Sequence, residues 1–181
     1  PSLVGSEMCI RDRGNLAKAE KQSLVYAKQE AEELVYNKVI IPRAGEYSLT
    51  LSDGTRERLN SDSEIRYPVA FGKDRRTVFL SGEAYFEVTK DAVRPFYVVL
   101  DGMEVKVYGT SFNVNTHYQG KILTTLIEGK VGIRVKSTGA ESLLQPNQMA
   151  EFSLENKDVK VTDVDTYYYT CLLYTSDAAD E

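Results

Sequence analysis

Apolar and polar residues alternate along most of the chain from residue 40 onward. The longest alternating stretch covers residues 76–88, and its apolar positions are Val78, Leu80, Ala84, Phe86 and Val88. A period of two is typical of a β-strand with one face in a core. Gly82 lies in the middle of this stretch, where its missing side chain allows a bulge, a bend or the close approach of another backbone. We therefore predict a bent or bulged central strand.

Shorter alternating segments precede and follow this central strand. They cover residues 47–52, 65–71, 96–100, 105–107, 122–127, 131–135, 150–154 and 159–161. Turn residues such as Asp53-Gly54 and Asp101-Gly102 separate some of them, as in β-hairpins. About a dozen short strands at regular intervals predict an all-β fold, a two-sheet antiparallel sandwich of the jelly-roll type. A β-solenoid is the structural alternative.

Two local signals lie just before the central strand. Pro68 falls inside the alternating segment 65–71, and because proline cannot donate a ladder hydrogen bond, we predict that this strand lies at a sheet edge or is bulged. The segment from Gly72 to Arg76 is short and strongly basic. A cluster of this kind on a mildly acidic domain predicts a solvated turn.

Residues 15–36 have a helical periodicity instead. Apolar residues recur at helical spacing among Lys, Glu and Gln, at Leu16, Ala19, Leu24, Ala27, Ala31, Leu34 and Val35. Pro42 lies beyond this pattern, where a helix must already have stopped. We predict one N-terminal helix, within a helix-and-linker segment at residues 14–37. It either leads into the β domain or packs on the edge of that domain.

The two ends of the chain resemble translated adaptor sequence. Residues 7–12 back-translate onto GAG-ATG-TGT-ATA-AGA-GAC, which resembles a transposase end sequence, and residues 171–176 back-translate onto TGT-CTC-TTA-TAC-ACA-TCT. Over their shared bases the two stretches are reverse complements, as adaptors on either side of an insert are. We therefore expect residues 1–13 and 171–181 to be adaptor, and residues 14–170 to form one domain with a short appendage.

Setting those ends aside changes what the composition implies. Both cysteines, Cys9 and Cys171, lie in them, so cysteine spacing predicts no disulfide, zinc site or thiol nucleophile. The ends also hold five acidic and two basic residues, so the net charge changes from −5 to about −2. This charge gives no electrostatic attraction to nucleic acid or to an anionic membrane. No run of about twenty apolar residues is present, so we expect no membrane-spanning helix in these residues.

Candidate catalytic groups are few. Glu83 and Glu87 face the same way, but four strand residues separate them by roughly 13 Å, wider than the carboxylate pair of a glycosidase. We expect them to be solvated or paired with arginines of neighbouring strands. His117 is the single histidine, so a multi-imidazole metal site is not available and a Ser-His-Asp triad would depend on it alone. We predict no catalytic, cofactor-binding or metal-binding residues.

Several ordered motifs resemble those of one known family. The central one is Gly82-Glu83-Ala84-Tyr85-Phe86-Glu87-Val88. Others follow the chain in order: Leu51-Ser52-Asp53-Gly54-Thr55, Leu59-Asn60, Arg66-Tyr67-Pro68, Pro95-Phe96, Gly109-Thr110-Ser111-Phe112-Asn113-Val114 and Thr124-Thr125-Leu126-Ile127-Glu128-Gly129. On these motifs the chain is identified as a member of the FecR family, the periplasmic sensing part of transmembrane anti-sigma regulators.

The resemblance implies a binding and relay module that is not an enzyme. It implies a FecR β domain at residues 38–156, and a linker at 157–170 toward a missing α/β domain. The implied partners are the signalling domain of an outer-membrane TonB-dependent transporter and, through a missing cytoplasmic segment, an extracytoplasmic-function sigma factor. The implied location is the periplasmic side of the inner membrane, reached through a missing transmembrane helix.

The motif residues that we single out as structural or interaction candidates share their match to the family. They are Asp53, Gly54, Thr55, Gly82, Glu83, Tyr85, Phe86, Gly109, Thr110, Phe112, Asn113, Glu128 and Gly129. For Asp53-Gly54-Thr55 and for residues 109–114, turn geometry accounts for the residue types without a ligand.

Two observations stand beside the resemblance. Glu57 and Arg58 occupy positions where the family usually has an apolar and an aromatic residue, and Pro146-Asn147-Gln148 replaces a usual Pro-Gly-Gln. An alternative function is a carbohydrate-binding β-sandwich, in which exposed Tyr85, Tyr97 or Tyr108 would be sugar platforms. Jelly-roll enzymes are a more distant alternative.

Overall fold

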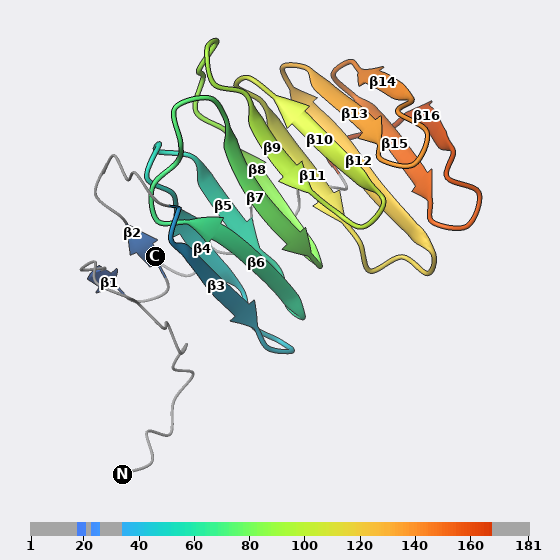
Figure 1. Cartoon of the computed structure of the whole chain (residues 1–181). Helices are drawn as coiled ribbons and strands as arrows, with labels where there is room; N and C mark the ends of the chain where they lie inside the picture. Colours follow the sequence, from blue (N-terminus) through green and yellow to red (C-terminus); the bar gives the residue numbers. More distant parts are fainter. Residues whose placement is uncertain (1–17, 21–22, 26–33, 168–181) are drawn as a thin grey trace.

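The computed structural model describes residues 18–20, 23–25 and 34–167, which form two β-sheets (Figure 1). The nine-stranded sheet contains β1 (Lys18–Glu20), β2 (Ser23–Val25), β4 (Tyr47–Thr50), β5 (Arg56–Leu59), β8 (Glu83–Glu87), β11 (Ser111–Asn115), β12 (Lys121–Glu128), β15 (Gln148–Ser153) and β16 (Val159–Asp163). The seven-stranded sheet contains β3 (Tyr36–Ile41), β6 (Ser63–Pro68), β7 (Arg76–Ser81), β9 (Phe96–Val99), β10 (Met103–Val107), β13 (Val131–Val135) and β14 (Glu141–Leu144). The predicted two-sheet antiparallel sandwich is confirmed.

The strands advance in chain order along both sheets. From β4 onward, hairpins alternate between the sheets: β4–β5, β6–β7, β9–β10, β11–β12, β13–β14 and β15–β16. β8 is the single strand that interrupts this alternation, so β7 and β9 become parallel neighbours. The layers therefore progress as the turns of a solenoid do, within a sandwich of two sheets. β16 continues the nine-stranded sheet into the segment 157–170.

Gly82 is the corner at which the chain changes sheets. β7 ends at Ser81 in the seven-stranded sheet, and β8 begins at Glu83 in the other. The φ angle of Gly82 is 113°, and a Cβ atom there would lie 2.6 Å from Ser63 Cα. The predicted bend and close backbone approach are both present, but the stretch 76–88 is two strands in two sheets and not one strand.

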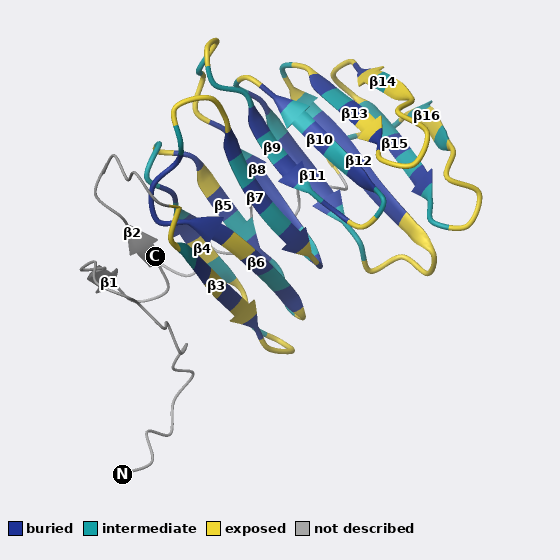
Figure 2. Ribbon diagram, viewed as in Figure 1, coloured by how far each residue is buried: buried dark blue, intermediate teal, exposed yellow. Residues whose placement is uncertain are grey.

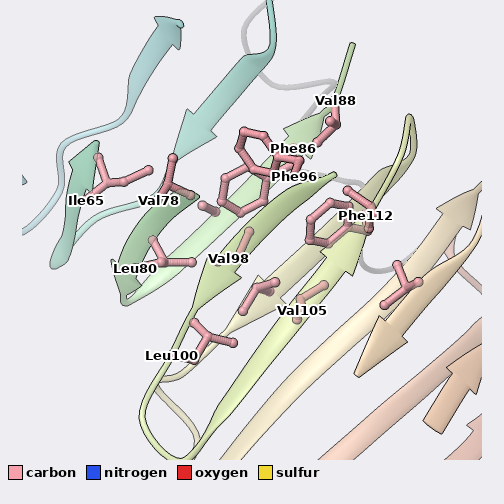
Figure 3. Packing of buried hydrophobic residues seen from close by; sticks show 14 of the residues in the cluster. Ile65, Val78, Leu80, Phe86, Val88, Phe96, Val98, Leu100, Val105 and Phe112 are labelled. Carbon is pink, nitrogen blue, oxygen red and sulfur yellow. The ribbon is translucent and has the colours of Figure 1, made fainter. Parts of the chain in front are cut away.

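The core lies between the facing sides of the sheets. Buried residues alternate with more exposed ones along most strands, as Figure 2 shows. Phe86 of one sheet stacks on Phe112 with 5.1 Å between ring centroids, and it approaches Phe96 of the other sheet at 6.2 Å (Figure 3). Burial of each such side chain contributes about 1.5–3 kcal/mol relative to exposure. The aromatic cluster therefore joins the two layers.

The N-terminal helix prediction is wrong where the structure describes that segment. Residues 18–20 and 23–25 are strands, and Tyr36 begins β3. β2 pairs in parallel with β4, so residues 23–25 form backbone hydrogen bonds with the edge of the sheet in place of a helix. The predicted helix had only a thin, alanine-rich apolar stripe, which gives little packing energy to stabilise it. The other residues of the predicted helix, apart from Leu34 and Val35, lie outside the described residues. In the part of the chain that is described, no helix is long and apolar enough to span a membrane.

Pro68 does not mark an edge strand. β6 lies between β3 and β7. Pro68 is its last residue and pairs with Tyr36 of β3, whereas the pairing with β7 covers only Glu64 to Arg66. Because the β7 ladder ends before Pro68, the missing N–H interrupts no hydrogen bond on that side.

Candidate functional site

The central motifs meet on the outer face of the nine-stranded sheet. β8 pairs with β5 on one side and with β11 on the other. Tyr85 lies opposite Arg58 of β5 and Asn113 of β11, and Asn113 in turn lies opposite Thr125 of β12. Because alternate strand residues point to opposite faces, these side chains point away from the core that Phe86 enters. We call this outward surface of β5, β8, β11 and β12 the motif face.

The centre of the motif face is buried, although it faces away from the core. Tyr85 is 5% exposed, Asn113 3% and Thr125 1%. Burial raises the pKa of the Tyr85 phenol above its ordinary value, and a side-chain hydrogen bond with Ser111 opposes that shift in part. Tyr85 is therefore not an exposed sugar platform, and that part of the carbohydrate-binding alternative is wrong.

Glu83 joins three segments of the motif face through its carboxylate. Asn60 Nδ2 donates to one oxygen at 2.8 Å, and Asn113 Nδ2 donates to the other at 3.1 Å. Hydrogen bonds to an ionised group contribute about 1.5–3 kcal/mol each. Glu83 is thus bound by amides and not by arginine.

Glu87, by contrast, has the arginine partner that was predicted. Its Oε2 lies 2.6 Å from Arg56 Nη2 of the neighbouring strand β5. Both side chains are partly exposed, so this ion pair stabilises the sheet by at most about 1 kcal/mol. Glu128, at the end of β12, is exposed.

Asp53 and Thr55 belong to a second cluster, centred on the buried Arg76, while Gly54 between them is exposed. Asp53 Oδ1 accepts the backbone N–H of Thr55 at 3.0 Å, and Oδ2 accepts the Thr55 hydroxyl at 2.8 Å. Arg76 Nη1 donates to the same Oδ2 at 2.6 Å, and it also donates to Thr89 O at 2.9 Å. The hairpin of one sheet is thereby fixed to the first residue of β7 in the other.

Arg76 is a residue that sequence reasoning misplaced. Its side chain is fully buried, so the prediction of a solvated turn is wrong at this position. Besides Asp53 it donates from Nε to the carbonyl of Arg94 at 3.0 Å, and its guanidinium carbon lies 5.4 Å from the centre of the Phe96 ring. The sequence did contain a signal for this burial. Arg76 lies two residues before Val78 and four before Leu80, so a strand that begins at Arg76 places its side chain on the same inward face as theirs.

Glu57 is a buried acid in an apolar setting. It is 1% exposed, and within the described part of the chain neither carboxyl oxygen has a hydrogen-bond partner. Its cross-strand neighbours are Leu49 and Phe86. Burial raises the pKa of Glu57 well above its ordinary value, and the nearby Asp53 charge raises it further. Glu57, which stands where the family usually has an apolar residue, therefore points into the core.

Gly109, Thr110 and Gly129 form a third cluster, at the start of β11. The Thr110 hydroxyl donates to Lys130 O at 3.0 Å. A Cβ atom on Gly129 would lie 2.8 Å from that hydroxyl oxygen, and one on Gly109 would lie 2.7 Å from Lys90 Cα. The glycines therefore permit close contact between successive loops, while Phe112 enters the core.

The motif face is suited to recognition through charge at its rim. Its exposed or partly exposed members include Arg56, Glu83 and Glu87, which are held by strands that are more rigid than loops, whereas the amide and hydroxyl groups at its centre are buried. No group of three His, Cys, Asp or Glu side chains in the described residues is arranged to hold a metal ion. Of the three clusters, the motif face is the one that brings Glu83, Tyr85 and Asn113 together.

The two-sheet β-sandwich agrees with the family comparison. Residues 38–132 match the family model "FecR protein", which covers more than half of the chain, so this chain belongs to the FecR family. All thirteen candidate residues fall within that match. The family is a regulatory kind of protein.

Solved structures support the same conclusion. Two crystal structures of a "putative anti-sigma factor" from Parabacteroides distasonis ATCC 8503 share 29% sequence identity with the chain, with TM-scores of 0.73 and 0.71. The aligned regions cover 78% and 76% of this chain but only 66% and 65% of those proteins. The chain thus spans under two thirds of their length. No curated protein sequence matches it.

Proposed function

We propose that this chain is the periplasmic signal-sensing and relay part of an inner-membrane anti-sigma regulator. Membership of the FecR family is the observation that carries the proposal, and the likeness to an anti-sigma factor structure supports it. In this proposal the partner is the signalling domain of an outer-membrane TonB-dependent transporter. An extracytoplasmic-function sigma factor is held by a cytoplasmic segment that the described β domain does not include.

The proposed sensing element is the β domain at residues 38–156, with residues 157–170 leading to a further domain. The motif face gives this domain a rigid surface, because Glu83 ties β8 to both neighbouring segments. A contact on that face can reach the other sheet through Gly82, whose flanking strands lie in different sheets. Relay also requires two states of the domain whose balance the partner changes.

The route toward the membrane differs from the one that the sequence suggested. We predicted a helix at residues 15–36 as the relay, but residues 18–20 and 23–25 of that segment are strands. β2 pairs with β4, and β3 pairs with β6. We propose that a change in the sandwich passes through these edge pairings into the N-terminal segment.

The experiment combines binding with a transcription reporter. The chain is titrated with the purified signalling domain of the transporter encoded beside its gene, and the full-length regulator is tested in cells with a sigma-dependent reporter. We expect saturable binding, and loss of reporter induction when residues 38–156 are deleted. Reporter activity that does not depend on the β domain, together with absence of binding, would contradict the proposal. Glu155→Ala, an exposed substitution, is the control.

A further inference from the structure

The outer face of the seven-stranded sheet holds cations over aromatic rings. Arg66 of β6 lies over the rings of Phe79 and Tyr36, at 4.0 Å and 5.0 Å from guanidinium carbon to ring centroid. Lys106 Nζ of β10 lies 5.9 Å from the centroid of Tyr97. All of these residues alternate with buried positions on their strands, so they share the outward side. We call this surface the cation–ring face; its members are Tyr36, Arg66, Arg75, Phe79, Tyr97, Lys106 and Tyr108.

The cations at the β9–β10 end share two tyrosines. Lys106 Nζ also lies 5.4 Å from the Tyr108 centroid, and Arg75 lies 5.9 Å from that of Tyr97. The side-chain hydrogen bond with Tyr108 raises the pKa of Lys106 above its ordinary value, so the amine remains charged. Ring contacts of this kind contribute about 0.5–1 kcal/mol at exposed sites. They hold the charged groups in place without neutralising them.

These cations lack the acidic partners that other basic residues have. Lys38 pairs with Glu64, Lys121 with Glu151 and Arg134 with Glu104. Within residues 34–167, none of Arg66, Arg75 and Lys106 forms an ion pair with a carboxylate. Three fixed positive charges therefore remain available to a negatively charged partner, although the chain as a whole is acidic.

We propose that the cation–ring face binds an acidic segment of a partner protein. Arg66 and Lys106 stand three strand spacings apart across the sheet and, by the pairing register, two residues apart along the strands, about 16 Å in all at the usual spacings. An extended peptide covers that distance in about five residues and places a side chain on the same side every second residue. Alternate carboxylates can therefore reach both cations, and the planar guanidinium of Arg66 can bind one of them with two hydrogen bonds.

The apolar neighbours of the cations favour a protein over a polyphosphate. Tyr108 is 47% exposed, and Leu143 of β14 is 58% exposed. Tyrosine and arginine are enriched in protein interfaces, where aromatic area supplies much of the affinity. The inference goes beyond the proposed function, since it does not depend on which signal the regulator senses.

The test uses a short labelled peptide that alternates glutamate with tyrosine, titrated against the whole chain at low salt by fluorescence anisotropy. We expect saturable binding that Arg66→Glu combined with Lys106→Glu weakens about tenfold or more, because attraction becomes repulsion. Tyr108→Ala should weaken it several-fold, an effect that charge alone would not produce. The same peptide with glutamine in place of glutamate should not bind. Thermal unfolding verifies that each variant is folded.

Lys160→Glu and Lys157→Glu together are the matched control, since they make the same charge change with exposed lysines in and beside the other sheet. Binding that falls equally in this control would show unspecific attraction and overturn the proposal. Absence of peptide binding would also overturn it. If a heparin fragment binds this face and the peptide does not, the occupant is an anionic glycan and the proposed partner class is wrong.

Discussion

Arg76 Nη1 lies 2.6 Å from Asp53 Oδ2, and the two side chains are 0% and 5% exposed. Asp53 belongs to the β4–β5 hairpin of the nine-stranded sheet, whereas Arg76 opens β7 of the other. A buried ion pair costs desolvation energy, so it stabilises only when its remaining hydrogen-bonding groups are satisfied. Thr55, Thr89 and Arg94 supply those bonds, except that Arg76 Nη2 has no partner among the described residues. The ion pair thereby fixes the relative position of the sheets at one end of the sandwich.

Removing the cation alone should be strongly destabilising. Arg76→Met leaves the Asp53 carboxylate buried without its charge partner, a loss of about 3–5 kcal/mol. The double variant Arg76→Met with Asp53→Asn should be less damaged, because no unpaired buried charge remains. Urea unfolding followed by circular dichroism measures both. Lys38→Met, which removes an exposed ion pair with Glu64, should cost less than about 1 kcal/mol. Equal losses for Arg76→Met and Lys38→Met would contradict this account.

Gly82→Ala should destabilise the sandwich more than an alanine at another glycine of positive φ. The new Cβ would meet the backbone of Ser63, 2.6 Å away at Cα, in addition to the strain of its φ angle. Gly120 has a φ of 69° and nothing within 4 Å of its Cβ position, so Gly120→Ala should cost only about 1–2 kcal/mol. The difference between the two combines the cost of separating β6 from the corner with the greater backbone strain of an alanine at a φ of 113° than at 69°. Similar midpoints of unfolding in the two variants would refute the close-approach explanation.

The sequence was sufficient to predict the sandwich because strand alternation directly marks inward positions. Val78, Leu80 and Phe86 all enter the core as predicted. The change of sheet at Gly82 was not predictable in the same way, since a bulge within one strand and a corner between two sheets leave the same residue pattern. Only the long-range contact with Ser63 distinguishes them.

Charged residues account for most of the remaining errors at the candidate sites. Arg76 was assigned to a solvated turn because of its charge, yet its position in the strand alternation places it inward. Glu57 also points inward, and among the described residues Arg76 has a hydrogen-bond partner there whereas the Glu57 carboxyl has none. The N-terminal helix was an error of another kind. Local helix propensity is weak, and pairing of residues 23–25 with β4 overrode it.

Glu83 should contribute more to stability than a carboxylate on the same sheet that lacks amide partners. Glu83→Ala removes the acceptor of Asn60 and Asn113, so we expect a loss of about 2–3 kcal/mol. Glu83→Gln keeps one amide oxygen as acceptor and should lose about half as much. Glu128→Ala, at an exposed position on β12, should change the free energy of unfolding by less than about 0.5 kcal/mol. If Glu83→Ala is as mild as Glu128→Ala, the amide contacts do not stabilise the motif face.

Replacing Glu57 with an apolar residue should stabilise the chain, and more so at neutral than at acidic pH. The pKa of Glu57 is higher in the folded state than in the unfolded state. The contribution of this carboxyl to the free energy of unfolding is therefore most favourable below the unfolded pKa of about 4.3, where it is protonated in both states, and is lost as pH rises through the folded pKa. Glu57→Met removes the titrating carboxyl and with it the loss of stability at higher pH. The methionine side chain is apolar, as are the cross-strand neighbours Leu49 and Phe86. The difference in unfolding free energy between Glu57→Met and the parent should therefore grow from pH 4 to pH 8.

Thermal and urea unfolding across that pH range measure the difference. Glu155→Met is the matched control, because Glu155 is exposed and the same change of residue removes no buried carboxyl. Its difference from the parent should be nearly independent of pH over the range. A Glu57→Met curve parallel to that of the parent would mean that Glu57 titrates as an ordinary solvated acid, which its 1% exposure and unpaired oxygens argue against.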